Sequence, residues 1–165
     1  MFLFLLFLCQ EKKKGISLRQ RKESYIFTQK NNKNMTYTEL AQLSVEAKKK
    51  ALPPYSNFHV GAALLTEDGK VYLGCNIETS SYSLTICAER TAVFKAISEG
   101  ERKFKAVAIA SDSPDFCPPC GSCRQVLFDL CGNIDVVMIN HKDEIKVLKM
   151  TELLPYAFSD VDLNK

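Results

Sequence analysis

Two short segments of the chain carry cysteines that could together form a metal centre, and one of them also carries a glutamate. Cys120 and Cys123 lie three residues apart at the expected start of a helix, so both sulfurs face one side of it. The unpaired N–H groups and the dipole of a helix N-terminus stabilise thiolates, the form of cysteine that binds a metal ion. With Cys87 as a third ligand, a tetrahedral zinc ion would keep one position for water, as catalytic zinc sites do.

The residues that follow Cys87 supply groups that such a zinc site would use. Zinc lowers the pKa of a bound water from about 15.7 to about 7, and Glu89 would lie beside that water. A carboxylate there can take a proton from the water and return it to a leaving amine, as hydrolytic deamination requires. Three thiolates overcompensate a divalent ion, so Arg90 is expected to hydrogen-bond to the sulfurs. The alternative is that Arg90 is an ordinary surface cation.

Cys117 leaves a second interpretation of the metal centre open. It precedes Cys120 by another three-residue step, and as a fourth ligand it would close the site and make the zinc purely structural. Pro118 and Pro119 prevent the helix from continuing back to Cys117. We therefore expect the Cys117 sulfur to lie off the shared face and the zinc to be catalytic.

Four further residues of metal-binding types are expected to have no part in the centre. Cys75 and Cys131 are predicted to be buried apolar residues, since free cysteine is commonly buried. His59 and His141 are too isolated in the sequence to act as ligands, and they are predicted to be structural or exposed.

Helical and strand-like segments alternate along the body of the chain. Thr36 and Glu39 form a capping box before a helix that is expected to end at Pro53, and a turn at 67–70 joins two strands into a hairpin. The order is helix, strand, strand, helix, strand, helix, strand, strand, which predicts an α/β fold with helices on the faces of a sheet of about five strands. The expected strands are 58–66, 71–75, 106–111, 134–139 and 145–148, and the later helices are 87–98 and 120–130.

The composition is that of one globular domain with a basic N-terminal segment. The 165 residues are 46% hydrophobic and 25% charged, which excludes a disordered, collagen-like or repeat chain. Residues 1–34 carry eight basic and two acidic side chains, whereas residues 35–165 carry 14 basic and 17 acidic ones. The mildly acidic body argues against a protein that follows the phosphates of nucleic acid, and it favours an uncharged small substrate.

Residues 1–34 are predicted to be a disordered extension and residues 35–165 to be the functional domain. The first eight residues are apolar but far fewer than the roughly 20 that span a bilayer, so no membrane helix is expected. A short export signal is the alternative, although the basic tract 12–14 follows the apolar run instead of preceding it. Seven cysteines, an odd number in a chain long enough to fold without disulfides, favour a reducing compartment, the cytoplasm.

Five segments of the chain, in sequence order, follow a recognisable pattern. They are PYSNFHVGAA (54–63), GCNIE (74–78), CAERTA (87–92), PCGSCRQ (119–125) and ELLP (152–155). The pair Cys-Ala-Glu and Pro-Cys-x-x-Cys is the general signature of zinc deaminases. Together the five segments resemble the small zinc-dependent cytidine deaminases that act on free nucleosides, and the resemblance covers roughly residues 36–163.

The resemblance implies a three-layer α/β/α sandwich with a mixed sheet, in which a homotetramer deaminates nucleosides. Zinc would be held by Cys87, Cys120 and Cys123. Glu89 would transfer protons, and Ala88 would contact the substrate. The implied reaction converts cytidine, and 2'-deoxycytidine, to the uridine product and ammonia in pyrimidine salvage. A nucleic-acid cytidine deaminase is the alternative within the superfamily, but the acidic body and the lack of a basic aromatic stripe count against it.

The residues that would bind the nucleoside also follow from the resemblance. In the family, a pair such as Asn76 and Glu78, which alternate on an extended segment, binds the sugar hydroxyls. Phe58 matches the aromatic residue that packs on the pyrimidine ring; a plain core residue is the alternative. Phe158 would reach the active site of a neighbouring subunit, and Tyr82 would make an intersubunit contact.

Overall fold

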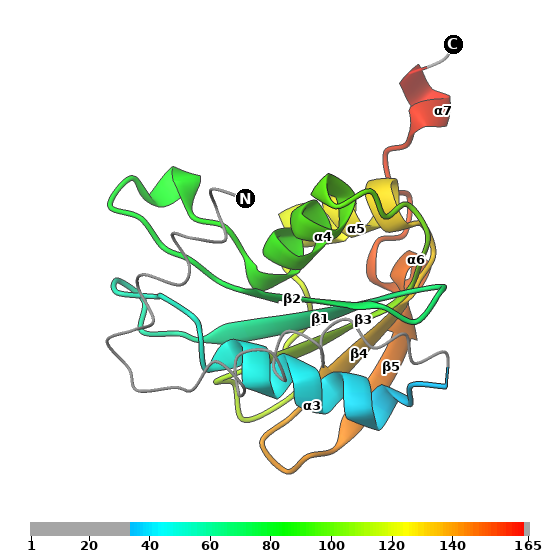
Figure 1. Cartoon of the computed structure of the whole chain (residues 1–165). Helices are drawn as coiled ribbons and strands as arrows, with labels where there is room; N and C mark the ends of the chain where they lie inside the picture. The colour runs from blue at the N-terminus through cyan, green and yellow to red at the C-terminus, as the bar shows by residue number, and fades with distance from the viewer. Residues whose placement is uncertain (1–33, 164–165) are drawn as a thin grey trace, which may run out of the picture. The chain divides into compact units, whose positions relative to one another are not determined.

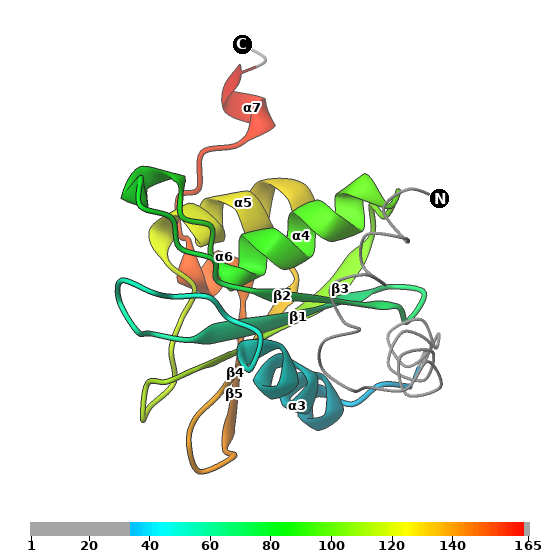
Figure 2. The same cartoon turned by 60° about the vertical axis from the view of Figure 1, so that its left-hand side comes forward.

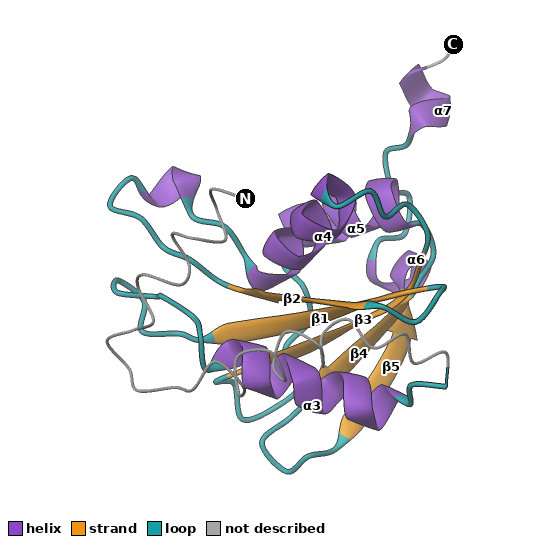
Figure 3. Ribbon diagram, viewed as in Figure 1, coloured by secondary structure: helices purple, strands orange, loops and turns teal. Residues whose placement is uncertain are grey.

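A computed structural model describes residues 34–163, so the predictions for residues 1–33 lie outside the described residues. The helices and strands are α3 (Tyr37–Lys48), β1 (Val60–Thr66), β2 (Val71–Cys75), η2 (Tyr82–Leu84), α4 (Ala88–Ser98), β3 (Phe104–Ser111), α5 (Gly121–Cys131), β4 (Asp135–Ile139), β5 (Ile145–Lys149), α6 (Met150–Leu153) and α7 (Asp160–Leu163) (Figures 1 and 3). None of these helices combines the length and apolar character needed to cross a membrane.

The strands form one mixed sheet of five strands, as predicted, and their order in the sheet is β2-β1-β3-β4-β5. β1 pairs antiparallel with β2 and with β3, β3 pairs parallel with β4, and β4 pairs antiparallel with β5. β1 and β3 are buried along nearly their whole length, as expected for apolar strands that are covered on both faces. The predicted hairpin joins β1 to β2, and Gly69 takes the left-handed conformation (φ 91°) in its turn.

Helices cover both faces of the sheet, which confirms the predicted three-layer α/β/α architecture. Alternate residues of β1 point to opposite faces. Ala62 and Leu64 join the hydrophobic cluster under α4 and α5, whereas Ala63 and Leu65 join the cluster under α3. Figures 1 and 2 show α3 on one side of the sheet and α4 and α5 on the other. Two separate hydrophobic cores therefore hold the helices on the sheet.

The directions of the strands place the N-termini of α4 and α5 at the same end of the strands. Gly61 at the start of β1 pairs with Cys75 at the end of β2 and with Ala110 near the end of β3, so β2 and β3 run parallel on either side of β1. The chain enters α4 after the end of β2, and it enters α5 after the end of β3. Both helices thus begin at the carboxyl ends of parallel strands, a common position for a functional site in an α/β sheet.

Helix α3 begins as predicted but ends earlier. The capping box is present, because the side chain of Thr36 accepts from Glu39 N–H and the side chain of Glu39 accepts from Thr36 N–H. The prediction that this helix continues to Pro53 is wrong. Leu52 instead pairs with Ile77 in an isolated β-bridge, so long-range pairing draws the chain out of the helix. The other predicted elements lie close to their expected bounds, and the short helices α6 and α7 are additional.

Gly74 allows α4 to lie very close to β2. A Cβ atom at this position would lie 2.3 Å from Ala88 O and 2.5 Å from Ala92 N, both in the backbone of α4. Gly61 makes a similar approach to α3, where a Cβ atom would lie 2.1 Å from Ser44 O. These distances are far below van der Waals contact, so a side chain at either position would displace a helix.

Candidate metal centre and active site

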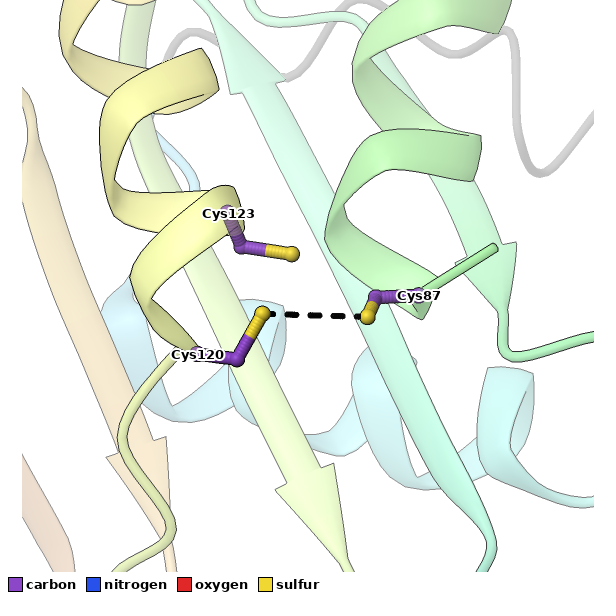
Figure 4. Close-up of side chains that lie close together, drawn as sticks. All are labelled: Cys87, Cys120 and Cys123. Carbon is purple, nitrogen blue, oxygen red and sulfur yellow. Dashed lines mark hydrogen bonds between the residues drawn. The ribbon is translucent and has the colours of Figure 1, made fainter. Parts of the chain in front are cut away.

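Three cysteine sulfurs meet between the N-termini of α4 and α5. Cys87 is the N-cap of α4, Cys120 is the N-cap of α5, and Cys123 lies in the first turn of α5. The sulfurs of Cys87 and Cys120 are 3.9 Å apart, and all three sulfurs lie within 4.8 Å of one another. Figure 4 shows the three side chains pointing toward the space between the two helices.

These distances fit a tetrahedral zinc ion. Zinc–sulfur bonds of about 2.3 Å place two sulfurs of a tetrahedron about 3.8 Å apart, close to the 3.9 Å between Cys87 and Cys120. Cys123 is buried, Cys87 is half-buried and Cys120 is exposed, so the group is open to solvent on the Cys120 side. Within residues 34–163 the group contains only these three cysteines, and the Cys117 sulfur instead lies 3.9 Å from Pro118 O. The structure thus brings the three predicted ligands together and leaves Cys117 outside.

Arg90 lies beside the sulfurs, as the sequence predicts. Its Nη2 donates to Cys87 Sγ (3.5 Å) and to Thr85 O (3.3 Å). Its Nε is buried and has no hydrogen-bond partner within the described part of the chain. The hydrogen bond to Cys87 raises the pKa of Arg90 further above its usual range. A permanent positive charge at this position offsets the excess charge of three thiolates and argues against an ordinary surface cation.

The pKa values of the Cys87 and Cys123 thiols are shifted in opposite directions. Hydrogen bonding from Cys123, together with Arg90 and Cys120, lowers the pKa of Cys87 to about 5 although burial acts against it. The same hydrogen bond and burial raise the pKa of Cys123 well above its usual range. Without a metal ion, Cys87 is therefore the more acidic thiol of the two. A bound metal ion favours ionisation of both, since metal binding releases thiol protons.

Glu89 is a buried carboxyl beside the sulfur group. It lies in the first turn of α4 and is only 4% exposed. Burial is the main cause that raises the pKa of Glu89 to about 7, and the negative charge of Cys87 adds to it, although hydrogen bonding with its own backbone and with Cys123 opposes the shift. A carboxyl with a pKa near neutrality can both give and take a proton, as a general acid and base must.

Asn76 and Glu78 follow β2 and hold the loop that precedes β1. The side-chain amide of Asn76 donates to Phe58 O (2.8 Å), and the Glu78 carboxylate accepts from Ser56 N–H (3.0 Å). Both side chains are nearly buried, at 8% and 7% exposed. The sequence predicts that this pair binds a sugar, and the structure adds a second role, which is to shape loop 53–59.

The other predicted substrate residues differ in how far they are exposed to solvent. Phe58 is 38% exposed as a residue, so part of it remains available to a ligand. Ala88 is fully buried as a whole residue, so its predicted contact with a substrate stays a prediction. Phe158 is exposed in the segment before α7, and its carbonyl accepts from Gln125 Nε2 of α5 (2.8 Å). Tyr82 is exposed on η2.

The prediction that Cys75 and Cys131 are buried is wrong, since both are half-buried. Each is the last residue of its element, β2 or α5, where packing is incomplete. His59 and His141 lie outside the sulfur group, as predicted. The ring of His59 pairs with Asp112 (2.7 Å), and the ring of His141 bonds to a backbone carbonyl.

Sequence reasoning missed two residues that shape the site, Gly74 and Ser56. Gly74 sets the approach of α4 to the sheet, and the Ser56 hydroxyl donates to Glu78 Oε1 (2.5 Å). Both lie within segments that carry the family resemblance, GCNIE and PYSNFHVGAA. The sequence therefore marked the segments, but only side-chain contacts reveal what these two residues do.

Gly74→Ala is expected to disturb the metal centre through α4. The new Cβ must displace the first turn of α4, which carries Cys87 and Glu89, and overpacking of this kind costs about 1–3 kcal/mol. We expect a lower melting temperature and a lower zinc content than in the unmodified chain. Gly121→Ala is the matched control, because a Cβ there meets nothing within 4 Å. Equal melting temperature and zinc content in the two variants would contradict this role of Gly74.

Comparison with known families agrees with the geometry of the site. Residues 34–140 match the family described as the cytidine and deoxycytidylate deaminase zinc-binding region, and this range contains the three clustered cysteines. The chain belongs to the cytidine deaminase family. Its cofactor is zinc, for which the sulfur group of Cys87, Cys120 and Cys123 has a suitable geometry.

Individual relatives align with most of the length of this cytidine deaminase family member. The cytidine deaminase of Sporosarcina psychrophila is 50% identical over 131 residues, which are 79% of this chain and 96% of that protein. The probable cytidine deaminase of Dictyostelium discoideum is 50% identical over 111 residues, 67% of this chain and 75% of that protein. The crystal structure of cytidine deaminase from Burkholderia pseudomallei matches with a TM-score of 0.73 and 46% identity over 75% of this chain and all of that one. The family resemblance seen in the sequence is confirmed.

Proposed function

We propose that the chain hydrolyses cytidine to uridine and ammonia, and 2'-deoxycytidine to 2'-deoxyuridine and ammonia. The observation that carries this proposal is the buried Glu89 carboxyl beside three sulfurs that fit one zinc ion. Zinc held by three thiolates keeps a fourth position for water and lowers the pKa of that water to about 7. Membership of the family and the two relatives at 50% identity support cytidine as the substrate.

Glu89 carries the protons of the proposed reaction. The oxygen of a water molecule adds to C4 of the pyrimidine, and Glu89 takes a proton from that water and delivers it to ring N3. The carboxyl then takes the remaining proton of the added oxygen and passes it to the amino group, which leaves as ammonia as the C4–N bond breaks and the C4 carbonyl forms. Its burial beside the sulfurs keeps this carboxyl close to both transfers. Arg90 keeps a positive charge at Cys87 throughout.

The nucleoside is proposed to lie between loop 53–59 and the start of α4. A side-chain amide has two N–H donors, so Asn76 keeps one for a sugar hydroxyl after it has bonded to Phe58 O. The exposed part of the Phe58 ring packs on the pyrimidine. Ala88 is proposed to contact the substrate through its backbone N–H. This group lies in the first turn of α4, where a helix leaves its N–H groups without intrahelical partners. Phe158 is proposed to complete the site of a neighbouring subunit.

A homotetramer that acts in pyrimidine salvage in the cytoplasm is part of the same proposal. Large apolar side chains near the site are exposed in the single chain, among them Leu52, Tyr55, Tyr82 and Leu84. Exposed apolar groups of this size commonly mark protein interfaces. The cysteines of the described residues are free thiols, which agrees with a reducing compartment. Light scattering is expected to give the mass of four chains, and the mass of one chain would contradict the tetramer.

An ultraviolet assay with cytidine tests the proposed reaction directly. The zinc-loaded full-length chain is expected to convert cytidine to uridine with release of ammonia. Removal of zinc by a chelator should abolish turnover, and added zinc should restore it. A zinc-loaded chain that leaves cytidine unchanged would contradict the proposal.

Free cytosine is expected to be a very poor substrate compared with cytidine. A site whose polar groups bond the sugar leaves them unpaired when the sugar is absent, which costs up to about 10⁴-fold in kcat/KM. Asn76 and Glu78 are nearly buried, so water poorly replaces the hydrogen bonds that they would lose without the sugar. The measurement is kcat/KM for both compounds under one set of conditions. Comparable values would remove the sugar-binding role from Asn76 and Glu78.

A further inference from the structure

The Glu78 carboxylate has all of its acceptor positions in use. Its Oε2 accepts from the backbone N–H groups of Tyr55 (2.9 Å) and Ser56 (3.0 Å). Its Oε1 accepts from the hydroxyls of Ser56 (2.5 Å) and Tyr82 (3.3 Å). A carboxylate offers about four acceptor positions, so these four donors occupy them. A sugar hydroxyl that binds Glu78 must therefore replace one of the four.

Of the four donors, the Tyr82 hydroxyl is the one that a ligand replaces with the smallest loss of hydrogen bonding. Its bond to Glu78 is the longest of the four, and Tyr82 lies on η2, outside loop 53–59. The other three donors belong to Tyr55 and Ser56, so the loss of any of them would loosen the loop itself. The bond between the Ser56 hydroxyl and Glu78 is thus retained when a nucleoside binds.

The Ser56 hydroxyl also connects Glu78 to Phe58. While it donates to Glu78, its oxygen accepts from Phe58 N–H (3.1 Å). Asn57 between them takes the left-handed conformation (φ 54°), which turns the chain so that Phe58 N–H reaches back to Ser56. On the other side, Phe58 O accepts from the Asn76 amide. Both backbone polar groups of Phe58 are therefore held by side chains that belong to, or bond to, the sugar-binding pair.

We propose that Ser56 is a positioning residue that couples the sugar-binding carboxylate of Glu78 to the base-packing ring of Phe58. This inference rests on the proposed function, because it assigns those two groups to one nucleoside. A hydroxyl that accepts from an amide and donates to a carboxylate is polarised by both partners, which strengthens both bonds. Without the hydroxyl, Phe58 N–H loses its acceptor and Glu78 loses its shortest hydrogen bond, so the carboxylate and the ring are no longer held in one arrangement.

Ser56→Ala is expected to raise KM for cytidine by roughly 10–100-fold, the range for a hydrogen bond to a charged group. The value of kcat should stay within about threefold, because the lost bonds act in nucleoside binding and leave the sulfur group and Glu89 untouched. The preference for cytidine over 2',3'-dideoxycytidine should fall with the rise in KM. Ser56→Thr keeps the hydroxyl and should restore the unmodified values. Ser98→Ala, an exposed serine at the far end of α4, is the matched control.

Hydrogen–deuterium exchange of the full chain without substrate supplies a second, activity-independent measurement. Amide exchange in peptides covering Phe58 should be faster in Ser56→Ala by about tenfold or more, and unchanged in Ser98→Ala. The effects of Ser56→Ala and Glu78→Gln should not multiply in the double variant if Ser56 acts through Glu78.

Three results separate this inference from its alternatives. Unchanged KM and unchanged exchange in Ser56→Ala would overturn it while leaving the proposed function intact. An equal loss of kcat/KM for both nucleosides, with a lower melting temperature, would show a purely structural role and overturn it as well. An unmodified, zinc-loaded chain that does not deaminate cytidine would instead overturn the proposed function and the substrate part of the inference, and the exchange rates would still decide whether Ser56 holds Phe58.

Discussion

Glu89→Gln is expected to lower kcat for cytidine by roughly 10⁴-fold while zinc stays bound, the upper end of the range for general acid–base catalysis. This factor corresponds to about 5 kcal/mol of transition-state stabilisation. Glutamine has nearly the shape of glutamate and fits the buried position without the cost of a buried charge. Its amide cannot take the proton of the attacking water or return one to the leaving amine, so the proton transfers fail while the sulfur group stays intact.

Zinc content and steady-state rates, measured on the same preparation, test this expectation. Glu99→Gln makes the same chemical change at the exposed C-cap of α4, the end away from Cys87, and should keep full activity. Near-normal turnover by Glu89→Gln would show that another group moves the protons. Loss of zinc from Glu89→Gln would show instead that Glu89 supports the metal and would leave no separate measure of its proton transfer.

Cys120→Ser is expected to release zinc and abolish turnover. A serine hydroxyl does not ionise near neutral pH, so the variant has two strong ligands in place of three. The loss of metal affinity should exceed the roughly 10–100-fold that follows removal of a group that only supports a ligand. Because Cys120 is exposed, the substitution leaves no cavity in the core, and the fold should survive in the metal-free state.

Cys117→Ser is the matched control for this prediction, because its sulfur lies only three residues away in the sequence but outside the sulfur group. It should keep both zinc and activity. Metal analysis after dialysis against a chelator distinguishes the two variants. Zinc retained by Cys120→Ser and lost from Cys117→Ser would reverse the ligand assignment and support the purely structural zinc site.

Short-range patterns in the sequence were sufficient to place most of the helices and strands. The capping box of Thr36 and Glu39 marks the start of α3, and Gly132, with a positive φ of 76°, is the C-cap of α5. These signals depend on residues within one turn or one hairpin of each other. The spacing of Cys120 and Cys123 is a signal of the same kind, which is why their shared face could be predicted.

Features that depend on distant segments were predicted poorly or not at all. The end of α3 was misplaced because Leu52 pairs with Ile77, a contact that no local pattern indicates. The burial of Cys75 and Cys131 was overestimated because residue type describes an average environment, whereas both residues lie at the ends of elements. The link from Ser56 to Glu78 was missed for the same reason, since it joins two separate loops.

The sequence by itself determined which residue types are available at two helix N-termini, and through its motifs it determined the family. Only the tertiary structure decided that Cys87 and Cys120, from different helices, approach to 3.9 Å, and that Glu89 is buried beside them. The physical reason is that periodicity and capping report interactions within one element. Distances between elements follow from strand direction and packing. The desolvation that raises the pKa of Glu89 exists only in the folded domain, in which other elements bury this carboxyl.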